Sequence, residues 1–133
     1  MATELLGDNV TQLTMSVSGP SRVMLSLSST GAVTIQSWSL GPLSPPSVRW
    51  QGAHVYQAQL TRGYLADTSP HVITITVHGW RGGVSGDNVV VGVSGHHQQG
   101  VSRLSPQLRQ FTQAHPAWVS FAAWTVDYKY YTL

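Results

Sequence analysis

Apolar and polar residues alternate along several short stretches of the chain. This period of two is typical of strands that bury one face, because successive side chains of a strand point to opposite sides of the sheet. Turn-forming residues separate the stretches, as Gly19-Pro20-Ser21 does after the first of them. The pattern predicts strands whose apolar side chains share one core: Leu13, Met15 and Val17; Val23, Leu25 and Leu27; Val33 and Ile35; Ile73, Ile75 and Val77.

Two more strands are predicted after the proline-rich stretch 41–46, which cannot form regular structure because proline removes backbone donors. The first of them, residues 53–60, carries four side chains on one face: His54, Tyr56, Ala58 and Leu60. The second, residues 88–93, is the most apolar stretch of the chain. A strand that is apolar on both faces is typical of the middle of a sheet, so residues 88–93 are predicted to be a central strand.

One helix is predicted in the C-terminal half of the chain, starting near Leu104. Ser105 is a favourable N-cap, and Pro106 suits the first helical position, where its missing N–H costs nothing. Pro116 restricts the backbone of the residue before it, so the helix should end by His115. The face of this helix predicted to be apolar carries Leu104, Leu108 and Phe111.

The last residues of the chain predict a terminal strand with one aromatic face. Its even positions are Trp124, Val126, Tyr128 and Tyr130, and its odd positions include Thr125, Asp127 and Lys129. Because buried aromatic side chains remove large apolar areas from water, the even face is predicted to seal the core. Deletion of residues 120–133 is therefore expected to abolish folding.

The predicted elements indicate an all-β fold. About seven to eight short strands, separated by Gly, Pro and Ser turns, favour an antiparallel β-sandwich of jelly-roll-like type with one short helix in its C-terminal half. The chain has 133 residues, of which 41% are hydrophobic, so it can form a core of its own. We expect a lead-in segment at residues 1–10 and a single domain at residues 11–133.

Charge and cysteine content restrict the possible functions. Only 9% of the residues are charged, the net charge is +2, and no basic run occurs, so nucleic acid is not expected as a partner. The chain has no Cys, which excludes a disulfide, thiol catalysis and a thiolate metal site within it. No apolar run is long enough to span a bilayer, so direct membrane insertion is not expected.

Catalytic and metal-binding patterns are weak. The serines in Gly92-Val93-Ser94-Gly95-His96 and Gly83-Val84-Ser85-Gly86-Asp87 lack the glycine spacing and the strand–turn–helix context of a nucleophile elbow. The six histidines have no carboxylate at a zinc-site spacing, and they are His54, His71, His78, His96, His97 and His115. We therefore predict no catalytic residue, no metal site and no cofactor in this chain.

Tryptophan and histidine residues near the predicted strand ends are the candidates for ligand binding. Trp38, Trp50 and Trp80 are placed at strand ends or in loops, where exposed indoles would bind a sugar or an extended peptide. The alternative is that these indoles close the ends of the sandwich, which is the interpretation we favour for Trp80. The remaining candidates are Arg81, beside Trp80, and His96 and His97, in a predicted loop at residues 94–102.

Asn9-Val10-Thr11 is an N-glycosylation sequon. Such a triplet has meaning only in a protein that enters the secretory pathway. Asn9 is therefore the predicted glycosylation site if the domain is lumenal.

Several short motifs together resemble a known family. They are Gly19-Pro20-Ser21 after a strand, Trp38-Ser39-Leu40-Gly41, Ser105-Pro106-Gln107-Leu108, and a Trp-containing segment followed by a Tyr-rich terminal strand. In this order, over residues 11–133, they are similar to the C-terminal lumenal region of the endoplasmic reticulum metallopeptidases. Those proteins are membrane-spanning and of the zinc aminopeptidase type. The resemblance implies that the two-zinc site lies in a separate N-terminal domain, so no catalytic residue is transferred to this chain.

The resemblance implies a non-catalytic accessory domain in the endoplasmic reticulum lumen, belonging to a membrane-anchored metallopeptidase. Its expected role is packing, substrate presentation or partner binding, and its expected partners are the rest of the parent protein or another lumenal protein. The alternative is a carbohydrate- or peptide-binding β-sandwich module that uses exposed Trp and loop His residues. An independent hydrolase is the least favoured interpretation.

Overall fold

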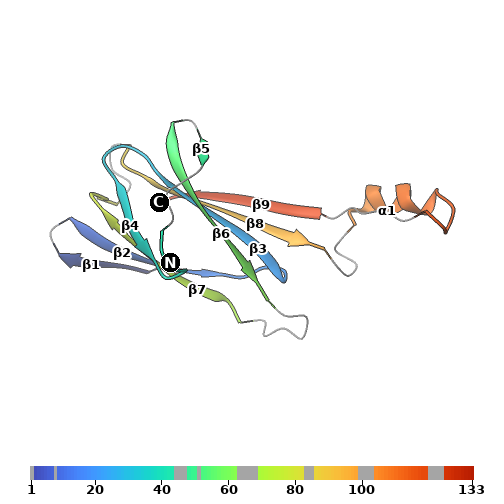
Figure 1. Ribbon diagram of the computed structural model, residues 1–133, viewed down its shortest axis with the longest axis horizontal. Coiled ribbons are helices and arrows are strands. Elements are labelled where there is room, and N and C mark those ends of the chain that lie inside the picture. Colours follow the sequence, from blue (N-terminus) through green and yellow to red (C-terminus); the bar gives the residue numbers. More distant parts are fainter. Residues whose placement is uncertain are drawn as a thin grey trace.

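The computed structural model describes residues 2–7, 9–43, 48–50, 52–62, 69–82, 86–98, 104–119 and 125–133. These residues form a four-stranded and a five-stranded antiparallel sheet that face each other (Figure 1). The four-stranded sheet has the order β1 (Ala2–Gly7), β2 (Val10–Val17), β7 (His71–His78), β4 (Thr34–Trp38). The five-stranded sheet has the order β5 (Val48–Trp50), β6 (Ala53–Thr61), β3 (Arg22–Ser29), β8 (Val89–His97), β9 (Thr125–Thr132). The predicted all-β sandwich is confirmed.

The core lies between the two sheets and follows the predicted alternation. On β2, β3 and β7 the buried side chains stand at every second position, and all of them are apolar except Thr11. Tyr56 and Leu60 of β6 pack against this core, whereas His54 is exposed beside β5, with its Nε2 lying 3.2 Å from Arg49 Nη2. The buried hydrophobic residues are Leu13, Met15, Val17, Val23, Leu25, Leu27, Val33, Ile73, Ile75, Val77, Val89 and Val91.

Strand β1 occupies most of the segment that was predicted to be a lead-in. It pairs with β2 and forms an edge of the four-stranded sheet, and all of its side chains are exposed. Asn9 lies between the two strands with φ of 61°, a left-handed conformation that asparagine tolerates better than most residues. The Asn9 side chain is exposed, whereas Thr11 of the same sequon is 4% exposed.

Strand β8 is longer than predicted. It lies between β3 and β9, so it is an interior strand, although β3 is the middle strand of the sheet. Pairing with β3 continues to His96, which lies opposite Arg22, and pairing with β9 continues to His97, which lies opposite Thr125. The prediction that His96 and His97 lie in a loop is therefore wrong, because the ladders supply backbone partners as far as these residues.

The predicted orientation of the terminal strand is also wrong. Val126, Tyr128 and Tyr130 are 44%, 62% and 69% exposed, so the even face does not seal the core. Strand β9 is the edge of its sheet, and its register with β8 turns the even positions to the outer face, away from the opposite sheet. Trp124, the first residue of the predicted aromatic face, lies outside the described residues.

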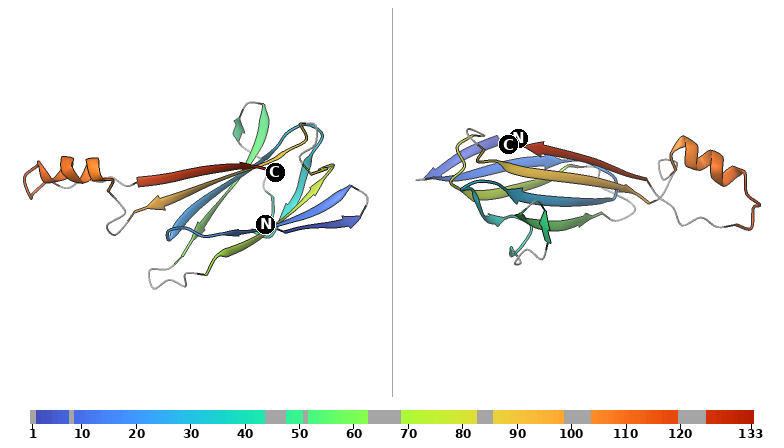
Figure 2. Two further views of the ribbon diagram at one scale, coloured as in Figure 1. Left: turned by 180° about the vertical axis from the view of Figure 1, so that it is seen from behind. Right: turned by 90° about the horizontal axis from the view of Figure 1, so that it is seen from above.

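Helix α1 (Pro106–Gln113) has the predicted ends but a different environment. Leu108 N donates to the Oγ of the N-cap Ser105 over 3.2 Å, proline stands in the first turn, and Ala114 is the C-cap. None of its described residues is buried, and Phe111 is 53% exposed. Figures 1 and 2 show α1 beyond the end of the sandwich at which β8 ends and β9 begins. The face predicted to be apolar therefore does not pack on the core.

Candidate functional site

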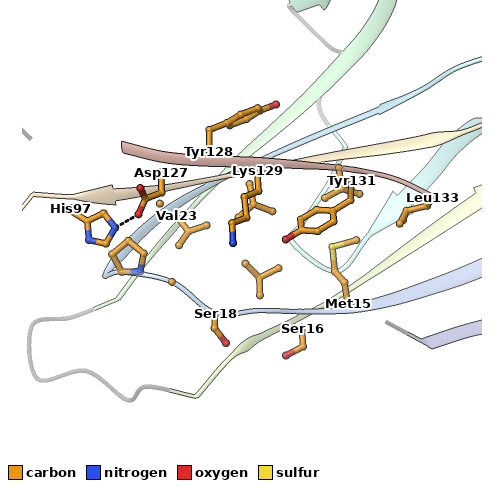
Figure 3. Close-up of a pocket in the computed structure, with 16 residues that line it drawn as sticks. Met15, Ser16, Ser18, Val23, His97, Asp127, Tyr128, Lys129, Tyr131 and Leu133 are labelled. Atoms are coloured by element: carbon orange, nitrogen blue, oxygen red, sulfur yellow. Dashed lines mark hydrogen bonds and ion pairs between the residues drawn. The ribbon is translucent and has the colours of Figure 1, made fainter. Parts of the chain in front are cut away.

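A groove of about 770 Å³ opens between β2 and the β8–β9 pair (Figure 3). Its apolar lining comes from both sheets: Met15 and Val17 from β2, Val23 from β3, and Val91 and Val93 from β8. The wall from β9 is lined by Lys129 and Tyr131, followed by Leu133 just after the strand, and Lys129 and Tyr131 point to the groove side of β9. The ring of Tyr128 points to the other side of that strand.

On this side of the sandwich, parts of two strands have a neighbour on one side only among the described residues. The described pairs of β1 and β2 run from Gly7, opposite Val10, to Ala2, opposite Thr14. Among the described strands, none pairs with Met15, Ser16 or Val17 on that side of β2. Strand β9 is the edge of the opposite sheet at the same place, so the groove runs between two strand edges that no described strand covers.

Close packing of Pro20 on β8 forms one end of the groove. A Cβ atom on Gly95 would lie 2.9 Å from Pro20 Cδ, closer than side chains normally approach, so the proline ring lies over the glycine. Gly19-Pro20-Ser21, which the sequence identifies as a turn, therefore also positions the connection between β2 and β3 against the five-stranded sheet.

The polar groups of the groove come from neighbouring strands. His97 Nε2 lies 2.8 Å from Asp127 Oδ2, and the side chains are 22% and 71% exposed. Asp127 is opposite Gly95 in the register, so this is a diagonal cross-strand pair on the inner face. An exposed pair of this kind stabilises the fold by roughly 0–1 kcal/mol. Among the described residues, Lys129 has no carboxylate partner.

Two of the predicted ligand-binding tryptophans pack against the core. Trp38 is half-buried and makes an edge-to-face contact with Tyr56, with ring centroids 6.5 Å apart and an interplanar angle of 67°. Its Nε1 atom is buried and has no hydrogen-bond partner in the described part of the chain. Trp80 also packs against the core, and its Nε1 donates to Leu133 O over 3.2 Å. These contacts are those expected if the two indoles close the ends of the sandwich instead of binding a ligand.

The other predicted ligand-binding residues are spread over the surface. Trp50 is 70% exposed on β5, which is the edge of the five-stranded sheet opposite to β9. Arg81 is exposed beside Trp80. On β8, the side chains of His96 and His97 point to opposite faces of the sheet. His96 Nε2 lies 3.3 Å from Ser94 Oγ. Of the six candidates, His97 lines the groove.

Sequence reasoning missed most of the groove, and in particular Asp127, Lys129 and Tyr131. The available signal was the odd face of the terminal strand, which combines charged residues with an aromatic residue. The larger number of aromatic residues on the even face instead favours burial of that face. The register between β8 and β9 instead turns the odd positions toward the groove.

Two further findings concern the part of the chain that the structure describes. No group of three or more His, Asp or Glu side chains there is arranged to hold a metal ion. No helix among the same residues is long and apolar enough to cross a bilayer.

The fold and groove define a β-sandwich domain with one open side and a projecting helix. The chain belongs to the family of the C-terminal domain of endoplasmic reticulum metallopeptidase 1, whose family model matches residues 1–131. The family expected from the short motifs is thus confirmed, and the match includes the residues of β1. Searches of curated proteins and of solved structures found no match.

Proposed function

We propose that this chain is a non-catalytic accessory domain on the lumenal side of a membrane-anchored zinc metallopeptidase, where it packs against the rest of the parent protein. The observation that carries the proposal is the uncovered α1 segment. Trp118 is 85% exposed, and the eight-residue helix has no buried side chain among its described residues. A helix this short is marginal in water without tertiary packing. A partner surface that covers α1 and Trp118 would supply that packing.

The lumenal assignment rests on the family and on the sequon. Asn9 is exposed between β1 and β2, and a glycan attached there would extend away from the core. Another lumenal protein is the second possible partner. The proposal includes no cofactor, no nucleic acid and no insertion of this domain into the bilayer.

The isolated domain should hydrolyse no aminopeptidase substrate, with or without added zinc. Catalytic zinc sites use three protein ligands and keep one position open, whereas the described lining of the groove contains two residues of these types, His97 and Asp127. The measurement is release of a chromogenic amine by the purified 133-residue chain. Zinc-dependent turnover that a chelator abolishes, and that a mock preparation lacks, would contradict the non-catalytic role.

Replacing Trp118 with alanine should weaken docking on the parent protein. A central interface tryptophan contributes about 2 kcal/mol or more, so capture of the domain by the parent protein lacking it should fall roughly 30-fold. Trp50→Ala is the matched control, because Trp50 is also exposed but lies on β5. Equal capture of the unchanged domain and Trp118→Ala, with both folded, would exclude this docking surface.

A further inference from the structure

Strand β9 has an edge that is open to pairing. Val89 and Leu133 exchange backbone hydrogen bonds of 2.9 and 3.3 Å, which identifies them as a hydrogen-bonded pair of the β8–β9 ladder. Such pairs alternate along an antiparallel ladder, so every second residue of β9 directs its N–H and C=O away from β8. These residues are Val126, Tyr128, Tyr130 and Thr132. No described strand lies on that side of β9.

The groove lies directly beneath this edge. A strand added to β9 would lie about 4.8 Å from it and would direct alternate side chains toward the groove. The groove lining there is apolar, with Met15 and Val17 on one side and Val91 on the other. Apolar side chains at alternate positions of the added strand would therefore fill the groove.

The charges of the groove specify one more property of the added strand. Asp127 is already paired with His97, at 2.8 Å. Lys129 points from β9 to the groove side and has no carboxylate partner in the described part of the chain (Figure 3). An ammonium group beside apolar surface favours a ligand that brings a carboxylate, because a charge-assisted hydrogen bond then replaces part of its lost hydration.

We propose that β9 and the groove bind an extended peptide segment of another protein, which pairs with β9 as an additional strand. Its alternate apolar side chains enter the groove, and one Asp or Glu among them binds Lys129. A second copy of this chain fits less well, because the groove-facing positions of its β9 include Lys129, which would bring a second cation into the groove. This site differs from the docking surface around Trp118, so the two proposals can fail independently.

A designed heptapeptide tests the site. The peptide is acetylated and amidated, carries valine, glutamate and valine at alternate positions, and has serine or threonine between them. Its binding to the full 133-residue domain is measured by nuclear magnetic resonance titration, which also locates the perturbed residues. The expected result is saturable binding with shifts along β9 and β2. N-methylation of the peptide nitrogens that would face β9 should abolish it, because β-addition depends on main-chain hydrogen bonds.

Charge reversal tests the carboxylate contact. Lys129→Glu should weaken binding of the glutamate peptide about tenfold or more and should reverse the preference toward the same peptide with lysine at that position. Arg81→Glu is the matched control, since it removes an exposed cation elsewhere and should leave binding unchanged. Trp118→Ala should also leave it unchanged, which separates this site from the proposed docking surface.

Three results would overturn the proposal. They are the absence of binding by the unmethylated peptide, binding that survives N-methylation, and equal loss of affinity in Lys129→Glu and Arg81→Glu. Self-association through β9 without peptide binding, seen as a concentration-dependent dimer in sedimentation, would assign the edge to a second copy instead.

Discussion

Deletion of residues 120–133 is expected to abolish the cooperative unfolding transition of the domain. The reason is the ladder between β8 and β9, together with the contacts of Leu133, and not an aromatic face buried in the core. Each lost backbone hydrogen bond costs roughly 1 kcal/mol, and the whole stability of an ordinary domain is about 5–15 kcal/mol. The deletion also uncovers Val89 and Val91, which are 0% and 2% exposed. Circular dichroism during heating measures the effect.

Deletion of residues 1–7 is the matched control, because β1 is the corresponding edge strand of the other sheet. All of its side chains are exposed, and its neighbour β2 remains paired with β7. This variant should keep a cooperative transition at a lower midpoint. If the chain without residues 120–133 also melts cooperatively, β9 is an addition to an already complete fold.

Trp80→Ala should lower the free energy of unfolding by about 3 kcal/mol, the lower end of the range for truncating a buried aromatic side chain. The indole packs against the core, and its Nε1 donates to Leu133 O over 3.2 Å, so the substitution also removes a link to the end of β9. Because Trp80 is half-buried, the loss should not reach the upper end of the range. Thermal unfolding should shift downward by roughly 10 °C.

Trp50→Ala provides the comparison, because Trp50 is 70% exposed on an edge strand. Its unfolding free energy should stay within about 0.5 kcal/mol of the parent domain, as for other surface substitutions. If Trp80→Ala melted together with Trp50→Ala, the indole of Trp80 would contribute little to the fold. The loop of Trp80 and Arg81 would then be a better candidate for ligand binding than it is in the present structure.

Patterns within single strands predicted most of the core. On β2, β3 and β7 most of the apolar residues occupy one face, and the other face carries mainly polar residues, so the pattern favours burial of the first face. The ends of α1 were predictable for a similar reason, because Ser105, Pro106 and Pro116 act on backbone groups within one turn of themselves. These features depend on local chemistry, so their prediction requires no knowledge of neighbouring strands.

The candidate site was much less predictable, because it depends on which strands are neighbours. His97 was recognised as a candidate, but its contact with Asp127 requires the register between two strands that are distant in sequence. Among the described residues, the groove lies where β2 beyond Thr14 and the whole of β9 have a paired neighbour on one side. Neither fact is contained in the alternation of one segment.

The sequence by itself determined that this chain is an all-β sandwich, which residues fill its centre, and which family it resembles. Tertiary structure decided which face of β9 turns inward and where α1 lies. Alternation shows that the two faces of a strand differ. Tyrosine is stable both in water and in apolar contact, so the number of tyrosines on a face does not show whether that face is buried. At the edge of a sheet the pairing partner makes that choice, and β8 turns Lys129 and Tyr131, rather than Tyr128 and Tyr130, toward the groove.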